Sequence, residues 1–414
     1  MNSFVLDCVR AQVDAVLSEI ARVEGAEFAY KHSQDALAET KKIFEAHRES
    51  LASITEESDP DAKELVCSTA FDDLSNSIEL LGFILRSTNI RNAFEAYGPM
   101  LRIARRLLGQ DTRLILSSEW HFSPFAFIGY HHLPGVVLIG LPAPESSNPF
   151  LLPLAGHELG HSAWPGFGID RQMEREVERA ILEEIAARWD EECRGYFGVS
   201  SADQVATDLL ARPKWRPAWD WALRQCEEHF CDFVGLRIFG GAFLYAFAYL
   251  LAPHRRGNRP LIYPNLRTRA ECLESAAIKY GIRVPDNYTQ LFENLSEPAP
   301  EQKREILLLR LADAVRARFV NDLQAKANEL VVNAGLGTSS PELVEHCAKR
   351  LRLMVPAEGS GGLDNILNAA WQGWLRSGFF LDSQHNEGKI ENLREVVLKS
   401  IEILEIETKR GVVT

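Results

Sequence analysis

The chain has 414 residues, 46% of them hydrophobic, which is enough to bury a sizeable core spread over two or three domains. Its formal net charge of -13 disfavours binding to nucleic acid and to anionic membranes, so neither partner is expected. The seven cysteines include no CxxC pair, which indicates neither a disulfide framework nor a cysteine zinc cluster and is typical of a reducing cytoplasm.

The N-terminal part of the chain is predicted to be helical. Residues 1–55 place apolar side chains at helical spacing between charged ones, as one or two long amphipathic helices would. This segment could bind a helical partner or a second copy of the chain. Charged residues interrupt its apolar positions, so no signal peptide is expected. Further helices are predicted over 62–87 and 90–108, which completes a helical region over 1–110.

Two short aliphatic segments follow, at 113–116 and 136–139, each bounded by turn residues. They predict strands of a small sheet. The next helix carries the sequence HELGH at 157–161. Its N-cap is expected at Ser146, Ser147 or Asn148, and Pro165 and Gly166 are expected to end it.

From residue 171 onward the sequence predicts helices almost throughout. The apolar stretch 240–253 is too short to span a bilayer core of about 30 Å, so it is interpreted as a buried helix. The expected fold class is mainly α with a small β-sheet (α+β). We expect a core over 111–285 and a helical C-terminal domain over 286–414. The predicted helices cover 171–194, 201–211, 215–239, 241–252, 266–281, 287–295, 300–334, 341–354, 362–377 and 386–409.

The segment His157-Glu158-Leu159-Gly160-His161 carries the clearest chemistry. Histidines four residues apart lie on one face of a helix, where two neutral imidazoles suit a tetrahedral zinc ion. Glu158 is rotated by about 100° from His157 around the helix axis, so it can face a metal-bound water and accept its proton as a general base. Leu159 and Gly160 are apolar and small, which lets the helix pack closely.

A catalytic zinc ion usually has three protein ligands and a water, so a third ligand is expected. Trp164 and Phe167 occupy the places that a glycine and a third histidine would need in HExxHxxGxxH. A carboxylate on a later helix remains. Glu228 is the best candidate, because it lies four residues before Asp232 among apolar neighbours, where a buried carboxylate needs a partner. Asp232 would then accept a hydrogen bond from the non-metal nitrogen of a ligand histidine.

Alternatives stay open at this point. Glu227, the residue directly before Glu228, is an alternative third ligand. Glu183 or Glu184 would supply one from a helix nearer in sequence. The segment 226–232 is also compatible with an ordinary amphipathic helix bearing an acidic stripe. HExxH itself fixes only three positions, and a helix with two hydrogen-bonded histidines satisfies it without any metal.

HExxH followed by a helical ExxxD resembles the gluzincin class of metallopeptidases, which includes thermolysin-like and CAAX-protease-like enzymes. The resemblance covers two short motifs and not the whole chain. Between His161 and Glu228 lie 66 residues, more than in thermolysin-like enzymes, and the inserted helices could cover the cleft. The resemblance implies a zincin-like core, with metal ligands His157, His161 and Glu228, general base Glu158 and supporting carboxylate Asp232.

Tyr263-Pro264, with Arg269 five residues beyond the proline, is similar to a His-Pro and arginine pattern in CAAX-protease-like gluzincins, with tyrosine in place of histidine. The resemblance makes Tyr263 a candidate for stabilising the oxyanion of a tetrahedral intermediate. The alternatives for this role are His254, Tyr245 and Tyr249.

The expected strand at 136–141 could bind a substrate backbone by β-addition, as an edge strand does in zinc peptidases. His131 and His132 come just before it and are minor candidates for a catalytic role. A histidine pair at this place is more typical of a turn.

The sequence therefore predicts a cytoplasmic zinc metallopeptidase that hydrolyses a selective protein or peptide substrate and needs Zn²⁺. A second hypothesis is a zinc-containing regulatory or protein-interaction protein with little or no peptidase turnover, because more than half of the chain is flanking helix without a catalytic motif. A third is a purely structural helical protein whose motif is accidental.

Overall fold

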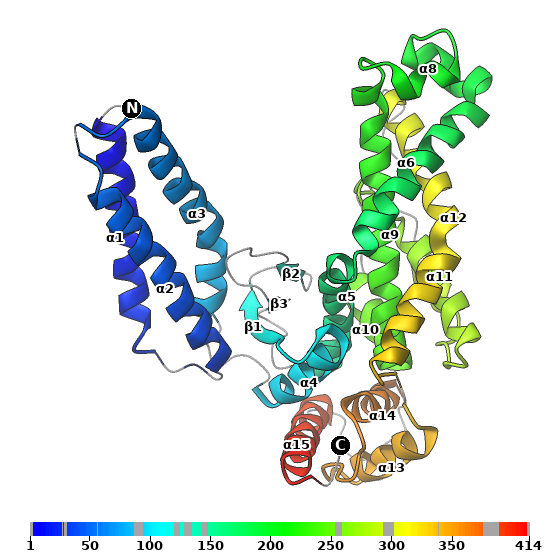
Figure 1. Ribbon diagram of the computed structural model, residues 1–414. Helices are drawn as coiled ribbons and strands as arrows, with labels where there is room; N and C mark the ends of the chain where they lie inside the picture. Colours follow the sequence, from blue (N-terminus) through cyan, green and yellow to red (C-terminus); the bar gives the residue numbers. More distant parts are fainter. Residues whose placement is uncertain are drawn as a thin grey trace. The chain divides into compact units, whose positions relative to one another are not determined.

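The computed structural model is mainly helical with one small sheet (Figure 1). The chain divides into two compact units. One comprises Met1–Tyr97 and Asp111–Ser147, and the other comprises Gly98–Gln110 and Asn148–Thr414. The structure describes residues 3–26, 28, 31–55, 57–86, 94–119, 125–127, 135–142, 148–252, 259–292, 302–337, 339–375 and 389–411.

Three long helices form most of the first unit: α1 (Ser3–Val23), α2 (Lys31–Ala52) and α3 (Pro60–Arg86). The sequence prediction for 1–55 is confirmed as two helices, with the turn near residue 25. Their apolar stripes meet in one core, which also takes in side chains from the sheet. Fully buried members of this core are Val13, Ala36, Phe44, Leu51, Ala70, Ile84, Ile115 and Leu138.

The sheet has three strands, β1 (Arg113–Glu119), β2 (Phe125–Phe127) and β3 (Val136–Pro142), in the order β1-β3-β2. β1 and β3 are parallel, with Arg113 opposite Val136, whereas β2 runs antiparallel to β3. The two predicted strands are confirmed, and each is longer than expected. The sequence did not predict β2, because three residues carry too little of a period-2 pattern.

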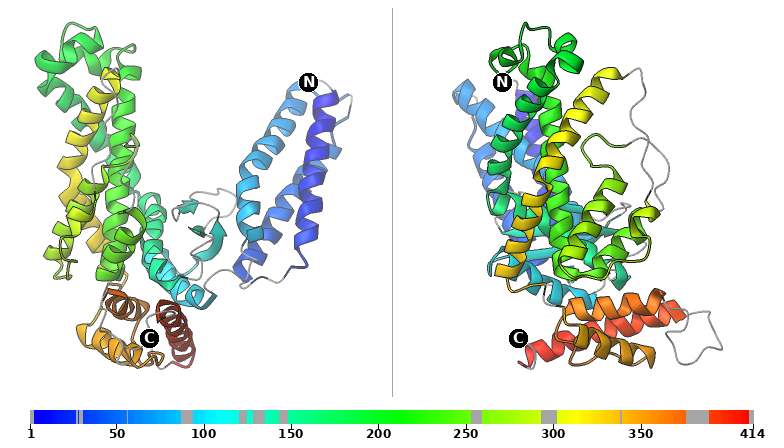
Figure 2. Two further views of the ribbon diagram at one scale, coloured as in Figure 1. Left: turned by 180° about the vertical axis from the view of Figure 1, so that it is seen from behind. Right: turned by 90° about the vertical axis from the view of Figure 1, so that its right-hand side faces the viewer.

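The second unit is built around α9 (Arg212–Phe239), which is flanked by α5 (Ala155–Gly166), α6 (Ile169–Ala187) and α12 (Lys303–Asn333). Figures 1 and 2 show α6, α9 and α12 running side by side. The second unit also contains α4 (Tyr97–Leu108), apart from its first residue. Its other helical elements are η3 (Pro149–Leu154), η4 (Trp189–Cys193), α7 (Arg194–Phe197), α8 (Ala202–Thr207), α10 (Gly241–Leu251), α11 (Leu266–Lys279), η5 (Tyr288–Leu291), α13 (Pro341–Arg352), α14 (Leu363–Leu375) and α15 (Lys389–Lys409). Within the described residues, most of the helices predicted after residue 171 are confirmed in approximate extent. Two predictions differ: 171–194 is divided into α6, η4 and α7, and 287–295 contains only the short 3-10 helix η5.

The two units do not follow the predicted boundaries at residues 110 and 285. The strands share a hydrophobic core with α1–α3, so they belong to the first unit and not to the unit that contains the HELGH helix. The short segment 98–110, which is α4 and its end, belongs instead with the second unit.

The hydrophobic helix α10 is buried, as its composition predicted, and is 11 residues long. Among the helices that the structure describes, none combines the length and the apolar character required to cross a lipid bilayer.

Candidate metal centre

The HELGH segment lies on α5, which continues directly from the short 3-10 helix η3. Asn148 caps η3, and not the HELGH helix as predicted, by accepting a hydrogen bond from the backbone N–H of Phe150. Leu154, which precedes α5, provides no side-chain cap. Ser146 and Ser147, the other predicted caps, lie outside the described residues. Pro165 and Gly166 form the last positions of α5, as predicted.

Helix α9 crosses α5 at very short range because small residues face each other. A Cβ atom added at Gly160 would come within 2.7 Å of the Cα of Cys231, and one at Gly156 within 3.0 Å of the Cα of Gly235. Any side chain at these two glycines would push the helices apart. The close approach brings carboxylates of α9 to the histidines of α5.

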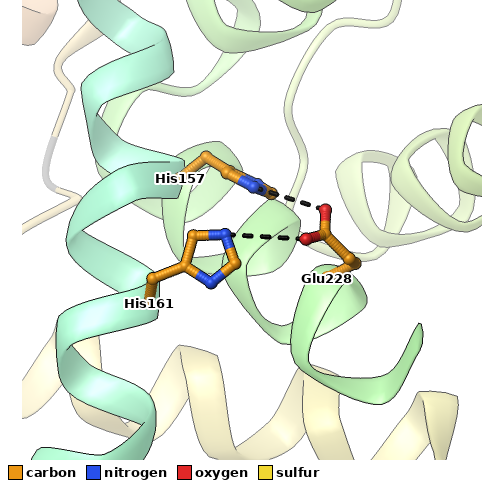
Figure 3. A group of neighbouring side chains, drawn as sticks. All are labelled: His157, His161 and Glu228. Atoms are coloured by element: carbon orange, nitrogen blue, oxygen red, sulfur yellow. Dashed lines mark ion pairs between the residues drawn. The ribbon is translucent and has the colours of Figure 1, made fainter. Parts of the chain in front are cut away.

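His157, His161 and Glu228 converge in the gap between the two helices (Figure 3). Nε2 of His157 lies 3.5 Å from Oε2 of Glu228, and Nε2 of His161 lies 3.6 Å from Oε1. Both distances exceed the 2.7–3.2 Å of an N–H···O hydrogen bond. Two ligand atoms that each lie about 2.1 Å from one tetrahedral zinc ion are about 3.4 Å apart, and the observed distances agree with this separation. These three residues could therefore hold a metal ion.

The other ring nitrogen of each histidine contacts a second carboxylate. Nδ1 of His157 lies 2.9 Å from Oδ1 of Asp232, and Nδ1 of His161 lies 3.0 Å from Oε1 of Glu227. A carboxylate at Nδ1 favours the tautomer that carries its proton there and leaves Nε2 free for a metal. Both histidines are thus oriented for binding through Nε2.

Asp232 is fully buried and is held by Arg269 of α11. The Nε and Nη2 atoms of Arg269 donate to its two oxygens at 2.8 and 2.7 Å, and Nη2 also lies 3.2 Å from Oε2 of Glu228. Burial alone would raise the pKa of Asp232, but the charge and hydrogen bonds of Arg269 outweigh it and hold that pKa well below its usual range. Asp232 therefore remains an anion behind His157.

Glu227 has the corresponding place behind His161. Its second oxygen accepts a hydrogen bond from Nη1 of Arg224 at 3.1 Å. Burial would raise the pKa of Glu227, yet the contacts with His161 and Arg224 lower it. Glu227, the alternative candidate for the third ligand, thus contacts the ring nitrogen of His161 opposite to the one that faces Glu228. The sequence offered Glu227 only as a rival ligand, and its spacing did not indicate that both carboxylates face α5, because adjacent helical residues are about 100° apart.

Glu158 is buried on α5, next to the histidines. Tyr263 lies in the turn before α11. Burial is the main cause that raises the pKa of its hydroxyl, and the negative charges of Glu228 and Glu158 raise it further. Tyr263 is therefore in the electrostatic neighbourhood of the centre, and 38% of it is exposed. The turn is fixed by Arg259, which donates to the carbonyl of Tyr263 at 3.1 Å and forms a bidentate ion pair with Asp313 of α12.

The other sequence candidates lie elsewhere or outside the described residues. Glu183 and Glu184 both pair with Arg318, and Glu184 also pairs with Arg188. Tyr245 and Tyr249 pack against Trp371 in an aromatic cluster. His131, His132 and His254 are not among the described residues.

The chemistry of the donor set is that of a three-ligand site with a free position. Two imidazoles and one carboxylate leave a fourth tetrahedral place for water or substrate. The side chains of His157, His161 and Glu228 are 12%, 16% and 9% exposed, so the centre borders on solvent and is not sealed. Comparisons with protein-family models, with curated proteins and with solved structures found no match to this chain.

Proposed function

We propose that this protein is a zinc-dependent metallopeptidase whose ligands are His157, His161 and Glu228. The observation that supports the proposal best is the pair of Nε2–Oε distances of 3.5 and 3.6 Å, too long for hydrogen bonds and matched to a shared metal ion. The carboxylates behind both histidines add to it, because metal-ligating histidines commonly have such partners.

Zinc, when bound, supplies a Lewis acid for a peptide carbonyl and lowers the pKa of a water toward ~7. Glu158, next to the ligands on α5, accepts the proton of the attacking water and passes it to the leaving amine. Tyr263 donates its hydroxyl hydrogen to the oxygen that becomes negative in the tetrahedral intermediate. Its raised pKa keeps that hydroxyl protonated at neutral pH. Asp232 and Glu227 hold the two imidazoles in the metal-binding tautomer.

The substrate we propose is a selective protein or peptide. The 66 residues between His161 and Glu228 supply the additional helices α6, α7 and α8, none of which contributes a residue to the ligand group. Such additions favour discrimination among substrates over general digestion. Rapid cleavage of unstructured casein would count against this part of the proposal.

Metal analysis of purified protein tests the ligand set. We expect about one zinc ion per chain in the wild type, and loss of zinc in His157→Ala. The matched control is His346→Ala, which removes an exposed histidine of α13 that bonds to the carbonyl of Glu358 and should leave the zinc content unchanged. Full zinc occupancy in His157→Ala would overturn the proposal.

Glu158→Gln tests the general base separately from the metal. We expect it to keep zinc and to lose peptide hydrolysis by a factor of about 10²–10⁴. Glu174→Gln, an exposed change on α6, is the control. The competing function is a zinc-containing regulatory or interaction protein, and the observation in its favour is that none of the described residues of the α1–α3 unit belongs to the centre. Equal behaviour of Glu158→Gln and wild type would favour that alternative.

A further inference from the structure

A cavity of about 340 Å³ lies in the second unit, apart from the metal centre. It is open to solvent on one side and is lined by α4, the loop after α12, the start of α14 and the helix α15. Ile238 of α9 is part of its wall and follows Glu228 by ten residues, a separation of about 15 Å along the helix at 1.5 Å per residue. The cavity is therefore a different place from the proposed active site.

Three arginines of α4 line this cavity: Arg102, Arg105 and Arg106. Their spacing of three and four residues puts them on one face of the helix. Arg102 is paired with Glu405 of α15. Among the residues that the structure describes, Arg106 forms no ion pair. A concentration of positive charge at one cavity is unusual in a chain whose formal net charge is -13.

Asp364 is the one acidic residue among those that line the cavity, and it does not neutralise the arginines. An arginine partner would lower the pKa of a carboxyl, whereas burial raises the pKa of Asp364 to about 6. The lining thus carries three positive side chains, of which Arg102 is paired with Glu405, and one carboxyl whose pKa is about 6.

Apart from the polar side chains of Gln110 and Thr408, the rest of the lining is apolar or glycine backbone. Ile103, Ile238, Leu336 and Leu404 supply aliphatic surface. The loop after α12 contributes Gly337, where φ is +70° and an added Cβ would lie 2.3 Å from the carbonyl oxygen of Arg237, so no side chain fits. Guanidinium groups beside an apolar wall suit a ligand with anionic oxygens and an apolar body. The volume is at the lower end of the range for small-molecule sites, about 300–1,000 Å³.

We propose that this cavity binds a small organic anion, whose phosphate or carboxylate group contacts Arg105 and Arg106 and whose apolar part contacts Ile103, Ile238 and Leu404. Such a site goes beyond the proposed peptidase activity and does not depend on it. Phosphate and carboxylate share the oxygen geometry that arginine recognises, so titration with one compound of each kind distinguishes them.

Calorimetric titration of the full chain with phenyl phosphate, benzoate and inorganic phosphate tests the proposal. We expect phenyl phosphate to bind more tightly than inorganic phosphate, because only the first has an apolar part. The double variant Arg105→Gln/Arg106→Gln should weaken phenyl phosphate at least tenfold. Arg171→Gln/Arg175→Gln removes the same charge from an exposed face of α6 and should bind as the wild type does. Tighter binding of benzoate would assign a carboxylate ligand.

A second variant leaves the charge intact. Thr408→Phe narrows the cavity from α15, so it should weaken phenyl phosphate and leave inorganic phosphate unchanged. Equal weakening by both double variants would show general charge attraction and overturn the proposal, as would the absence of saturable binding of both phenyl phosphate and benzoate. Circular dichroism confirms that each variant is folded, and zinc content, unchanged in all of them, separates this result from any failure at the metal centre.

Discussion

Glu227 and Glu228 are neighbours on α9, yet they contact opposite nitrogens of the same histidine. Oε1 of Glu227 lies 3.0 Å from Nδ1 of His161, and Oε1 of Glu228 lies 3.6 Å from Nε2. One imidazole is therefore held between two adjacent carboxylates. The first distance is that of a hydrogen bond, and the second leaves room for a metal ion between the atoms.

Glu227→Ala should weaken zinc binding about 10- to 100-fold, because it removes the acceptor that fixes the tautomer and direction of His161. The dissociation constant from competition with a chelator measures this. Glu183→Ala, which removes an exposed carboxylate paired with Arg318, is the control and should leave the constant unchanged. Wild-type affinity in Glu227→Ala would mean that the contact has no part in metal binding.

Tyr263→Phe should lower kcat by about 10²-fold while zinc content stays at one per chain, because the change removes one donor to the oxyanion and no metal ligand. Steady-state kinetics on a cleaved peptide, with metal analysis of the same sample, makes the measurement. Tyr280→Phe removes a hydroxyl that donates to the carbonyl of Gln324, away from the centre, and serves as control. Undiminished kcat in Tyr263→Phe would remove this tyrosine from the mechanism.

Gly160→Ala should destabilise the protein by about 1–3 kcal/mol and weaken zinc binding, since its Cβ would lie 2.7 Å from the Cα of Cys231. Thermal unfolding and metal content report the two effects. Gly166→Ala, at the end of the same helix, meets no atom within 4 Å and is the matched control. If both variants have the melting temperature of the wild type, α5 and α9 are less tightly packed than their backbones indicate.

Asp364→Asn should stabilise the protein at pH 7.5. A folded-state pKa of about 6, above the ordinary 3.8, means that the folded protein favours the protonated carboxyl. The charged form therefore costs stability above pH 6, and the cost disappears as the pH falls toward 4. The gain from the substitution, at most about 3 kcal/mol by this linkage, should shrink over that range. Denaturant unfolding at several pH values measures it.

Asp61→Asn, an exposed change in the first turn of α3, is the control for Asp364→Asn. Its effect on the free energy of unfolding should be small and should not change between pH 6 and pH 4. A stabilisation by Asp364→Asn that is independent of pH would contradict the role given to the buried charge.

Much of the second unit could be predicted from the sequence, because local patterns determine it. The apolar spacing and proline or glycine boundaries predicted α9, α10 and α11 within a few residues of their observed ends. HExxH predicted that His157 and His161 share a face of α5, and the apolar neighbours of Glu228 indicated a buried carboxylate beside them.

Contacts between distant segments could not be predicted in this way. Nothing in the sequence near Glu227 says that its partner is Nδ1 of His161, since that depends on how closely α5 and α9 approach. Arg269 appeared in the sequence only as part of a spacing pattern, and its bidentate contact with Asp232 needs the fold of α11 against α9. The strands 113–119 and 136–142 follow their pattern, but their packing against α1–α3 is a long-range property.

The segment 98–110 packs with the second unit although the chain on both sides of it belongs to the first. The backbone therefore passes between the units three times, near residues 97, 110 and 147. No single cut separates them: a chain that begins at Asn148 lacks α4, and one that ends at Gln110 lacks the strands. Expression of either unit alone requires rejoining the chain across a deletion, and proteolysis at one linker leaves two covalent connections intact.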